Sequence, residues 1–175
     1  AASGRPPPPA PPGTMQLRPL HDQVVVILGA SSGIGRACAL RMAARGAKVV
    51  VAARGTAALE SLVADIRVAG GVAAHAECDV ADHAQVEAVA ALAVDLFGRI
   101  DTWVNCAAVA VYARFEDTTL DEVRRVMDVN FMGQVHGMRA ALPHLRAAGG
   151  GAIVAISSVE GVVSLPLHSA YAASK

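Results

Sequence analysis

Residues 24–45 read VVVILGASSGIGRACALRMAAR, and the expected fold follows from their order. A run of β-branched and aliphatic residues leads into a turn with glycines at positions 29, 33 and 35, which opens a helical stretch. Glycines allow a tight turn and a close approach of the backbone to a phosphate, and a helix N-terminus offers unpaired N–H groups. The pattern therefore predicts a nucleotide-binding turn. An ordinary glycine turn between a strand and a helix is the alternative interpretation.

Four further apolar runs alternate with stretches of helical periodicity. With residues 24–28, the runs at 48–52, 72–77, 102–105 and 152–157 predict five strands. Apolar residues repeat at i, i+3, i+4 and i+7 over residues 59–66 and 86–93, which predicts a helix in each range. A longer helix is expected from about residue 119 to residue 148, with an apolar stripe through Leu120, Phe131 and Leu142 and a bend near Gly133 or Pro143. Right-handed crossovers then favour an α/β fold with a doubly wound parallel sheet.

Composition and charge exclude several classes of protein. The chain has 175 residues, 54% of them hydrophobic, and its 15 basic side chains balance its 15 acidic ones. No net field would therefore attract nucleic acid or an anionic membrane. The longest apolar run, residues 24–30, is far shorter than the roughly 20 residues of a membrane span. Three cysteines make no disulfide framework, and no secretory signal is present, so we expect a cytoplasmic protein without a metal site.

The N-terminal region differs in composition from the rest of the chain. Residues 1–19 are rich in proline and small residues, including Pro6 to Pro9, and are predicted to be disordered. Residues 20–175 are predicted to form one nucleotide-binding domain. With about five strands, this domain is expected to be incomplete at its C-terminus.

Arg54 follows the second predicted strand. Domains that bind NAD carry an acidic residue at this point for the ribose 2′-hydroxyl. A guanidinium suits a 2′-phosphate instead, and charge-assisted hydrogen bonds would favour NADP(H) over NAD(H) roughly 10- to 150-fold. A solvated surface arginine is the alternative.

Tyr171 and Lys175 are spaced at i and i+4, so both side chains share one face if the segment is helical. An ammonium near a phenol stabilises its deprotonated form and makes tyrosine a usable acid and base. Ser158 closes the last predicted strand, where the carboxyl edge of a parallel sheet binds ligands. A Tyr-x-x-x-Lys pattern alone often arises by chance, but here it accompanies Ser158, the glycine turn and the strand order.

Taken together, these motifs resemble the short-chain dehydrogenase/reductase family from about residue 20 to residue 175. The glycine spacing G-x-x-x-G-x-G is typical of that family and disfavours the related epimerases and dehydratases. The resemblance implies a set of cofactor-binding residues: Gly29, Ser31, Ser32, Gly33, Ile34, Gly35, Arg54, Asp79, Val80, Asn105, Ala107, Tyr171 and Lys175. Within this set Asp79 would accept the adenine amino group, although an aspartate before a helix can also be its N-cap.

The resemblance also implies a reaction. Hydride would pass between NADP(H) and a small-molecule carbonyl or secondary alcohol, with Ser158 polarising the oxygen and Tyr171 exchanging its proton. Lys175 would support Tyr171 and hold the nicotinamide ribose. Asn130 would hold a water that relays protons to the lysine, and an asparagine that bonds only the backbone of a helix kink is the alternative.

Three positions depart from the family pattern, and the chain ends early relative to it. Leu28 replaces a threonine, and Cys106 and Ala108 replace an asparagine and a glycine. Cys106 is interpreted as a packing residue. The chain stops after the Tyr-x-x-x-Lys motif, so we expect low activity from this stretch alone and a homo-oligomer for the complete protein. A non-catalytic nucleotide- or partner-binding chain, or an inactive gene fragment, is the rival interpretation.

Overall fold

A five-stranded parallel sheet forms the centre of the computed structural model, which describes residues 17–175. Its strands are β1 (Val24–Leu28), β2 (Lys48–Ala53), β3 (Val72–Glu77), β4 (Thr102–Asn105) and β5 (Ala152–Ala155). They lie in the order β3-β2-β1-β4-β5, and every neighbouring pair is parallel. The predicted doubly wound α/β fold is confirmed. β5 is two residues shorter than predicted because its only partner, β4, ends at Asn105 opposite Ala155.

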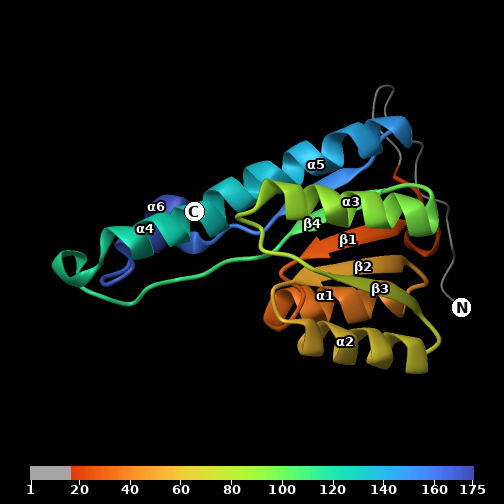
Figure 1. Cartoon of the computed structure of the whole chain (residues 1–175), viewed down its shortest axis with the longest axis horizontal. Coiled ribbons are helices and arrows are strands. Elements are labelled where there is room, and N and C mark those ends of the chain that lie inside the picture. Colours follow the sequence, from red (N-terminus) through yellow and green to blue (C-terminus); the bar gives the residue numbers. More distant parts are fainter. Residues whose placement is uncertain (1–16) are drawn as a thin grey trace, which may run out of the picture.

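Helices cover both faces of the sheet (Figure 1). The helices α1 (Gly33–Ala43) and α2 (Thr56–Val68) pack on one face, and α3 (His83–Phe97) and α5 (Gly133–Ala147) pack on the other. β1 is buried throughout: Val25 and Ile27 belong to the core beneath α1 and α2, while Val24, Val26 and Leu28 belong to the core beneath α3 and α5. A strand covered on both faces needs apolar side chains on both, which explains the uninterrupted apolar run.

The long helix predicted from residue 119 to residue 148 is divided into three parts. These are α4 (Leu120–Met127), a π-helical turn (Asp128–Met132) and α5. The π turn lies directly before Gly133, whereas Pro143 sits inside α5 without ending it. A wider turn of this kind is uncommon and is often found at functional sites.

The apolar stripe predicted for this helix was wrong at several positions. Leu120, Phe131 and Leu142 are 72%, 51% and 39% exposed. The buried face consists mainly of small residues and carries Val126, Val129, Asn130, Gly133, Gly137, Ala140, Ala141 and Leu145. Small side chains let the helix backbone approach the sheet, since a Cβ at Gly137 would lie only 2.8 Å from Trp103 Nε1 of β4. The close approach of the helix to the sheet, more than the size of its apolar side chains, decided which face of the helix is buried.

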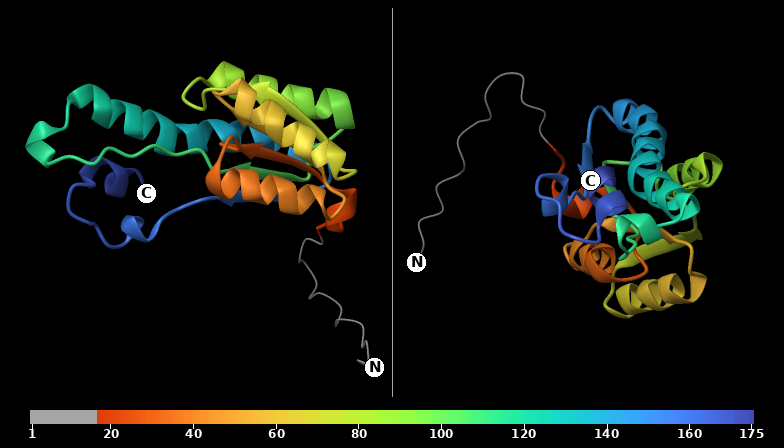
Figure 2. Two further views of the ribbon diagram at one scale, coloured as in Figure 1. Left: turned by 90° about the horizontal axis from the view of Figure 1, so that it is seen from below. Right: turned by 90° about the vertical axis from the view of Figure 1, so that its left-hand side faces the viewer.

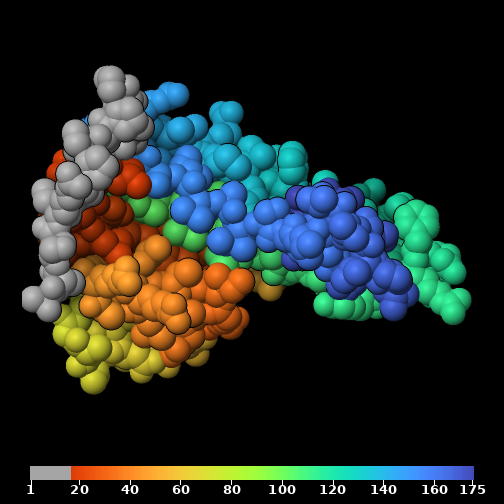
Figure 3. All heavy atoms as spheres, turned by 180° about the vertical axis from the view of Figure 1, so that it is seen from behind, coloured from red at the N-terminus to blue at the C-terminus, as the bar shows by residue number. Residues whose placement is uncertain are grey.

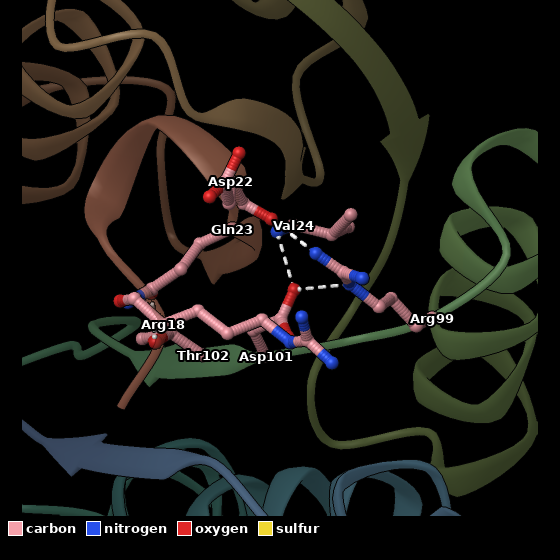
Figure 4. A network of polar contacts seen from close by, with 7 residues as sticks. All are labelled: Arg18, Asp22, Gln23, Val24, Arg99, Asp101 and Thr102. Carbon is pink, nitrogen blue, oxygen red and sulfur yellow. Dashed lines mark hydrogen bonds and ion pairs between the residues drawn. The ribbon is translucent and has the colours of Figure 1, made fainter. Parts of the chain in front are cut away.

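A polar network joins the amino-terminal ends of β1 and β4 (Figure 4). Asp101, 4% exposed, accepts hydrogen bonds from Val24 N–H at 2.8 Å and Arg99 Nε at 2.9 Å. Arg18 Nε lies 3.3 Å from the other oxygen of the same carboxylate. Arg18 therefore ties the chain before β1 to the domain. The predicted disordered segment, residues 1–19, falls mostly outside the described residues.

The opposite end of the sheet carries an extension. Residues after β5 form a short 3-10 turn (Val159–Gly161) and α6 (Ser169–Ser174), which lie beside α4 and project from the body of the sheet (Figures 2 and 3). Two other 3-10 turns span Leu20–Asp22 and Phe115–Asp117. In the described part of the chain, no helix has both the length and the apolar character to cross a membrane, and no three acidic, histidine or cysteine side chains gather into a metal site.

Candidate functional site

One cavity of about 520 Å³ opens at the carboxyl ends of the strands. It lies where the chain order reverses between β1 and β4, which is where open α/β sheets bind ligands. Eleven of the predicted site residues line it: Gly29, Ser31, Ser32, Gly33, Ile34, Arg54, Asp79, Val80, Ala107, Tyr171 and Lys175. Predicted residues from the first and last motifs of the chain therefore share one cavity.

The glycine turn is built by close backbone contacts. Gly29 has φ +80°, and a Cβ there would lie 2.5 Å from Ala107 Cα, so only glycine fits between the turn and the loop after β4. The N–H groups of Gly29 and Ala30 donate to Ala52 O at 2.7 and 3.2 Å. These bonds tie the turn to β2 although Leu28, buried at 1% exposure, replaces the family's threonine.

The start of α1 faces the cavity with free donors. Ser32 is the N-cap of this helix, but its side chain caps none of the first N–H groups. A Cβ at Gly33 would meet nothing within 4 Å, so the backbone there borders open space. An anion fits such a helix end because N–H groups and the helix dipole both favour negative charge. Gly35 does not line the cavity: it packs under the turn against Gly29.

Arg54 and Asp79 lie on the same side of the cavity. Arg54 is exposed, and within residues 17–175 no carboxylate comes within ion-pair distance of it. Asp79 accepts hydrogen bonds from Ala81 N–H at 3.0 Å and from Arg125 at 2.8 Å. Partial burial opposes ionisation, but these bonds and the nearby guanidinium groups hold the pKa of Asp79 below its ordinary value.

The helix-cap interpretation of Asp79 does not describe α3. The N-cap of that helix is Asp82, whose side chain accepts from Ala84 N–H and Gln85 N–H. Asp79 instead pairs with Arg125 of α4, which is 46 positions further along the chain and also lines the cavity. Sequence reasoning missed Arg125 because its contact with Asp79 arises only from tertiary packing.

Tyr171 lies in α6 and Lys175 is the C-cap of that helix, and their side chains lie close together, as their spacing predicts. Lys175 Nζ lies 5.6 Å from the centre of the Tyr171 ring and donates to Ile156 O at 2.9 Å. Burial lowers the pKa of the Lys175 ammonium, with Cys106 opposing the shift. Burial also raises the pKa of the Cys106 thiol, which agrees with a packing role for that side chain.

Ser158 does not line the cavity, whereas Ser157 does, with its Oγ 3.5 Å from Lys175 O. Ser158 Oγ accepts from Glu160 N–H at 3.2 Å, and this contact caps the 3-10 turn after β5. Because the hydroxyl oxygen is the acceptor, the hydroxyl hydrogen stays available to another acceptor.

Asn130 occupies the π turn and is 1% exposed. Its Oδ1 accepts from Val109 N–H at 2.8 Å, and its Nδ2 donates to Val109 O at 2.8 Å and to Ser174 Oγ at 2.9 Å. The asparagine therefore links the loop after β4 to α6 beside Lys175, and its side-chain bonds go to residues outside its own helix.

The side chain of Asn105 points into the protein. It is 3% exposed, accepts from Trp103 Nε1–H at 2.8 Å and donates to Gln134 O at 3.2 Å. Three further residues line the cavity and were missed by sequence reasoning: Val109 in the loop after β4, and Ile156 and Ser157 directly after β5. These loop residues carry no motif of their own.

Residues 23–175 match a family model described as short chain dehydrogenase. Among curated proteins, an uncharacterized oxidoreductase, YxnA, of Bacillus subtilis is 41% identical over 162 residues, covering 92% of this chain and 46% of the relative. Dehydrogenase/reductase SDR family member 7B of Bos taurus is 40% identical over 162 residues, covering 89% of this chain and 50% of the relative. The chain thus spans about half the length of these relatives.

Solved structures give the same similarity. A short chain dehydrogenase/reductase from Burkholderia phymatum in complex with NAD superposes with a TM-score of 0.84 at 36% identity, covering 87% of this chain and 54% of that one. Levodione reductase superposes with a TM-score of 0.83 at 34% identity, covering 87% and 60% of the two chains.

Proposed function

Because this chain belongs to the short-chain dehydrogenase/reductase family, we propose that it forms the nucleotide-binding part of an oxidoreductase that transfers hydride between NADP(H) and a carbonyl or secondary alcohol. The observation that supports this proposal is the single cavity that contains the glycine turn, Arg54, Tyr171 and Lys175. The matched relatives are about twice as long, so substrate and partners belong to the complete protein.

The cavity suits a dinucleotide. The free N–H groups at the start of α1 would hold the pyrophosphate, Asp79 would accept the adenine amino group, and Arg54 would bind a 2′-phosphate. The exposed guanidinium of Arg54 supports NADP(H), while one structural relative is described in complex with NAD. When bound, the nicotinamide would supply hydride donor or acceptor chemistry at its C4.

The protein's own groups would manage the proton and the oxygen. In the direction of reduction, the Tyr171 hydroxyl gives its proton to the substrate oxygen, and in oxidation it takes a proton back. The Lys175 ammonium stabilises the phenolate that remains. Ser158 donates its free hydroxyl hydrogen to the same oxygen, and Asn130 holds Ser174 next to Lys175 and remains the candidate for the proton relay.

Oxidation of NADPH with a panel of carbonyl compounds, using the complete protein, tests the proposal. Tyr171→Phe removes the transferable proton but nearly keeps the shape, so kcat should fall at least 1,000-fold (about 4 kcal/mol of barrier) while the Kd for NADPH changes by less than about threefold. Tyr112→Phe is the matched control: it keeps the ring that packs edge-on against His168 and removes only the hydroxyl of a tyrosine that is 74% exposed, so kcat should stay within about twofold of wild type.

A non-catalytic nucleotide-binding chain predicts a different result. It would bind NADPH with a measurable Kd, yet no carbonyl compound would accelerate the oxidation of NADPH. A Tyr171→Phe protein that keeps more than a tenth of the wild-type kcat would show that another group supplies the proton.

A further inference from the structure

A buried acid–base pair lies next to the catalytic residues. Glu160 Oε2 is 2.7 Å from His168 Nδ1, and the two side chains are 10% and 8% exposed. In every other ion pair of the described chain at least one partner is about a third exposed or more. A carboxylate facing Nδ1 makes that nitrogen the donor. Burying such a pair costs desolvation energy, and removing one partner leaves the other buried without its partner, which is strongly destabilising.

The pair bridges the two segments that carry Ser158 and Tyr171. Glu160 N–H donates to Ser158 Oγ at 3.2 Å, so the residue contacts Ser158 through its backbone and His168 through its side chain. His168 O accepts from Ala172 N–H at 2.8 Å and starts α6, and the His168 ring lies 5.9 Å from the Tyr171 ring. A short chain of contacts thus runs from Ser158 through Glu160 and His168 to Tyr171.

The connecting loop buries few apolar side chains. Val159 and Val162 are 74% and 88% exposed, so apolar burial contributes little there. Leu167, directly before His168, has φ +69° and is the one non-glycine residue with a positive φ among residues 17–175. A strained conformation of this kind persists only where surrounding contacts hold it. The buried pair, the edge contact of the Tyr112 ring with the His168 ring (4.0 Å between centroids) and the bond from Ala113 N–H to Leu167 O, at 3.2 Å, hold this segment.

We propose that Glu160 and His168 are positioning residues that set Ser158 and Tyr171 at the spacing where both reach one substrate oxygen. The inference rests on the proposed carbonyl chemistry. The pair touches neither substrate nor cofactor in this role and acts through the residues on either side of it. A misplacement of a catalytic group by about 1 Å can cost about 100-fold in rate, so loss of the buried Glu160–His168 bond should lower kcat strongly.

The test compares two changes at position 168 in the complete protein. His168→Asn keeps an N–H donor close to the place of Nδ1, and His168→Leu removes it. We expect His168→Leu to lower kcat about 100-fold and His168→Asn to stay within about threefold of wild type, with the Kd for NADPH unchanged in both. His21→Leu is the matched control: it removes an exposed histidine 3.5 Å from Asp22 at the far end of β1, and kcat should not change.

The reciprocal change Glu160→Leu removes the same bond from the other side, so it carries the same expectation should His168→Leu fail to fold. Equal losses of kcat in His168→Asn and His168→Leu would overturn the proposal, and so would a loss below threefold in both leucine variants. Amide hydrogen exchange over residues 159–174 separates this idea from the proposed function. If wild type shows no carbonyl-dependent turnover, the proposed function fails, yet faster exchange in His168→Leu still supports the pair, and unchanged exchange refutes it.

Discussion

Alanine substitutions at Gly29 and Gly33 separate the packing of the glycine turn from its proposed contact with a phosphate. Both residues have positive φ, +80° and +53°, so alanine is strained at both. They differ in their surroundings: a Cβ at Gly29 would lie 2.5 Å from Ala107 Cα and N, while a Cβ at Gly33 would meet nothing within 4 Å. Both variants carry the cost of a left-handed backbone at alanine, and only Gly29→Ala adds a clash with Ala107.

The difference in stability follows from that contact. The left-handed backbone costs alanine about 1–2 kcal/mol, and the lower entropy of the unfolded chain returns about 0.4–1 kcal/mol, at both sites. These contributions cancel in the comparison. Forcing a methyl group against the backbone of Ala107 adds about 1–3 kcal/mol at Gly29 alone. At about 2–4 °C per kcal/mol, Gly29→Ala should melt roughly 2–12 °C below Gly33→Ala.

Gly33→Ala should also weaken the binding of NADPH. A methyl group there protrudes into the cavity where the N–H groups of α1 would hold the pyrophosphate, so we expect the Kd for NADPH to rise at least tenfold (about 1.4 kcal/mol) with little loss of stability. Thermal melting of the complete protein and titration with NADPH measure the two quantities. Equal melting temperatures for the variants would refute the contact argument, and a Kd within twofold of wild type for Gly33→Ala would favour the ordinary glycine turn.

Three further changes test other parts of the structure. Arg54→Asp should reverse the cofactor preference from NADP to NAD, measured as the ratio of the two dissociation constants; tighter binding of NAD than NADP by wild type would contradict the assignment of Arg54. Asp101→Leu leaves the Val24 N–H buried without its acceptor and should cost about 1–3 kcal/mol, whereas Asp101→Asn keeps an acceptor for that N–H and should cost less than Asp101→Leu; equal denaturation midpoints for the two variants would argue against this. Because the pKa of Asp79 is lowered in the folded state, its contribution to stability is present above the ordinary carboxyl pKa and is lost as the pH falls through the lowered value. Arg125→Leu should therefore flatten the acid limb of the stability profile, and an unchanged limb would show that Arg125 does not cause the shift.

Much of the layout could be predicted from local patterns. The apolar runs identified all five strands to within two residues, since a strand buried on both faces must be apolar along its length. The i, i+4 spacing predicted that the side chains of Tyr171, in α6, and Lys175, its C-cap, lie close together, and the glycine spacing identified the turn that lines the cavity. Patterns of this kind report covalent neighbours, and local geometry converts them directly into structure.

The errors arose where packing between distant segments decides the outcome. The helix before β5 buries glycine and alanine, because the closeness of α5 to the sheet, not hydrophobicity alone, selects its inner face. The partner of Asp79 is Arg125, and the end of β5 depends on the length of β4. No window of sequence contains both members of such a pair.

For this protein, the order of motifs along the chain determined the fold class, the family and most of the lining of the cavity. Only the tertiary structure decided how the pieces inside it are held: Asn130 against Ser174, Asn105 turned into the core, and Glu160 against His168 beside Tyr171. The physical reason is that hydrogen bonds and close contacts act over a few ångströms in space. Residues far apart in the sequence reach that range only when the sheet and its helices have brought them together.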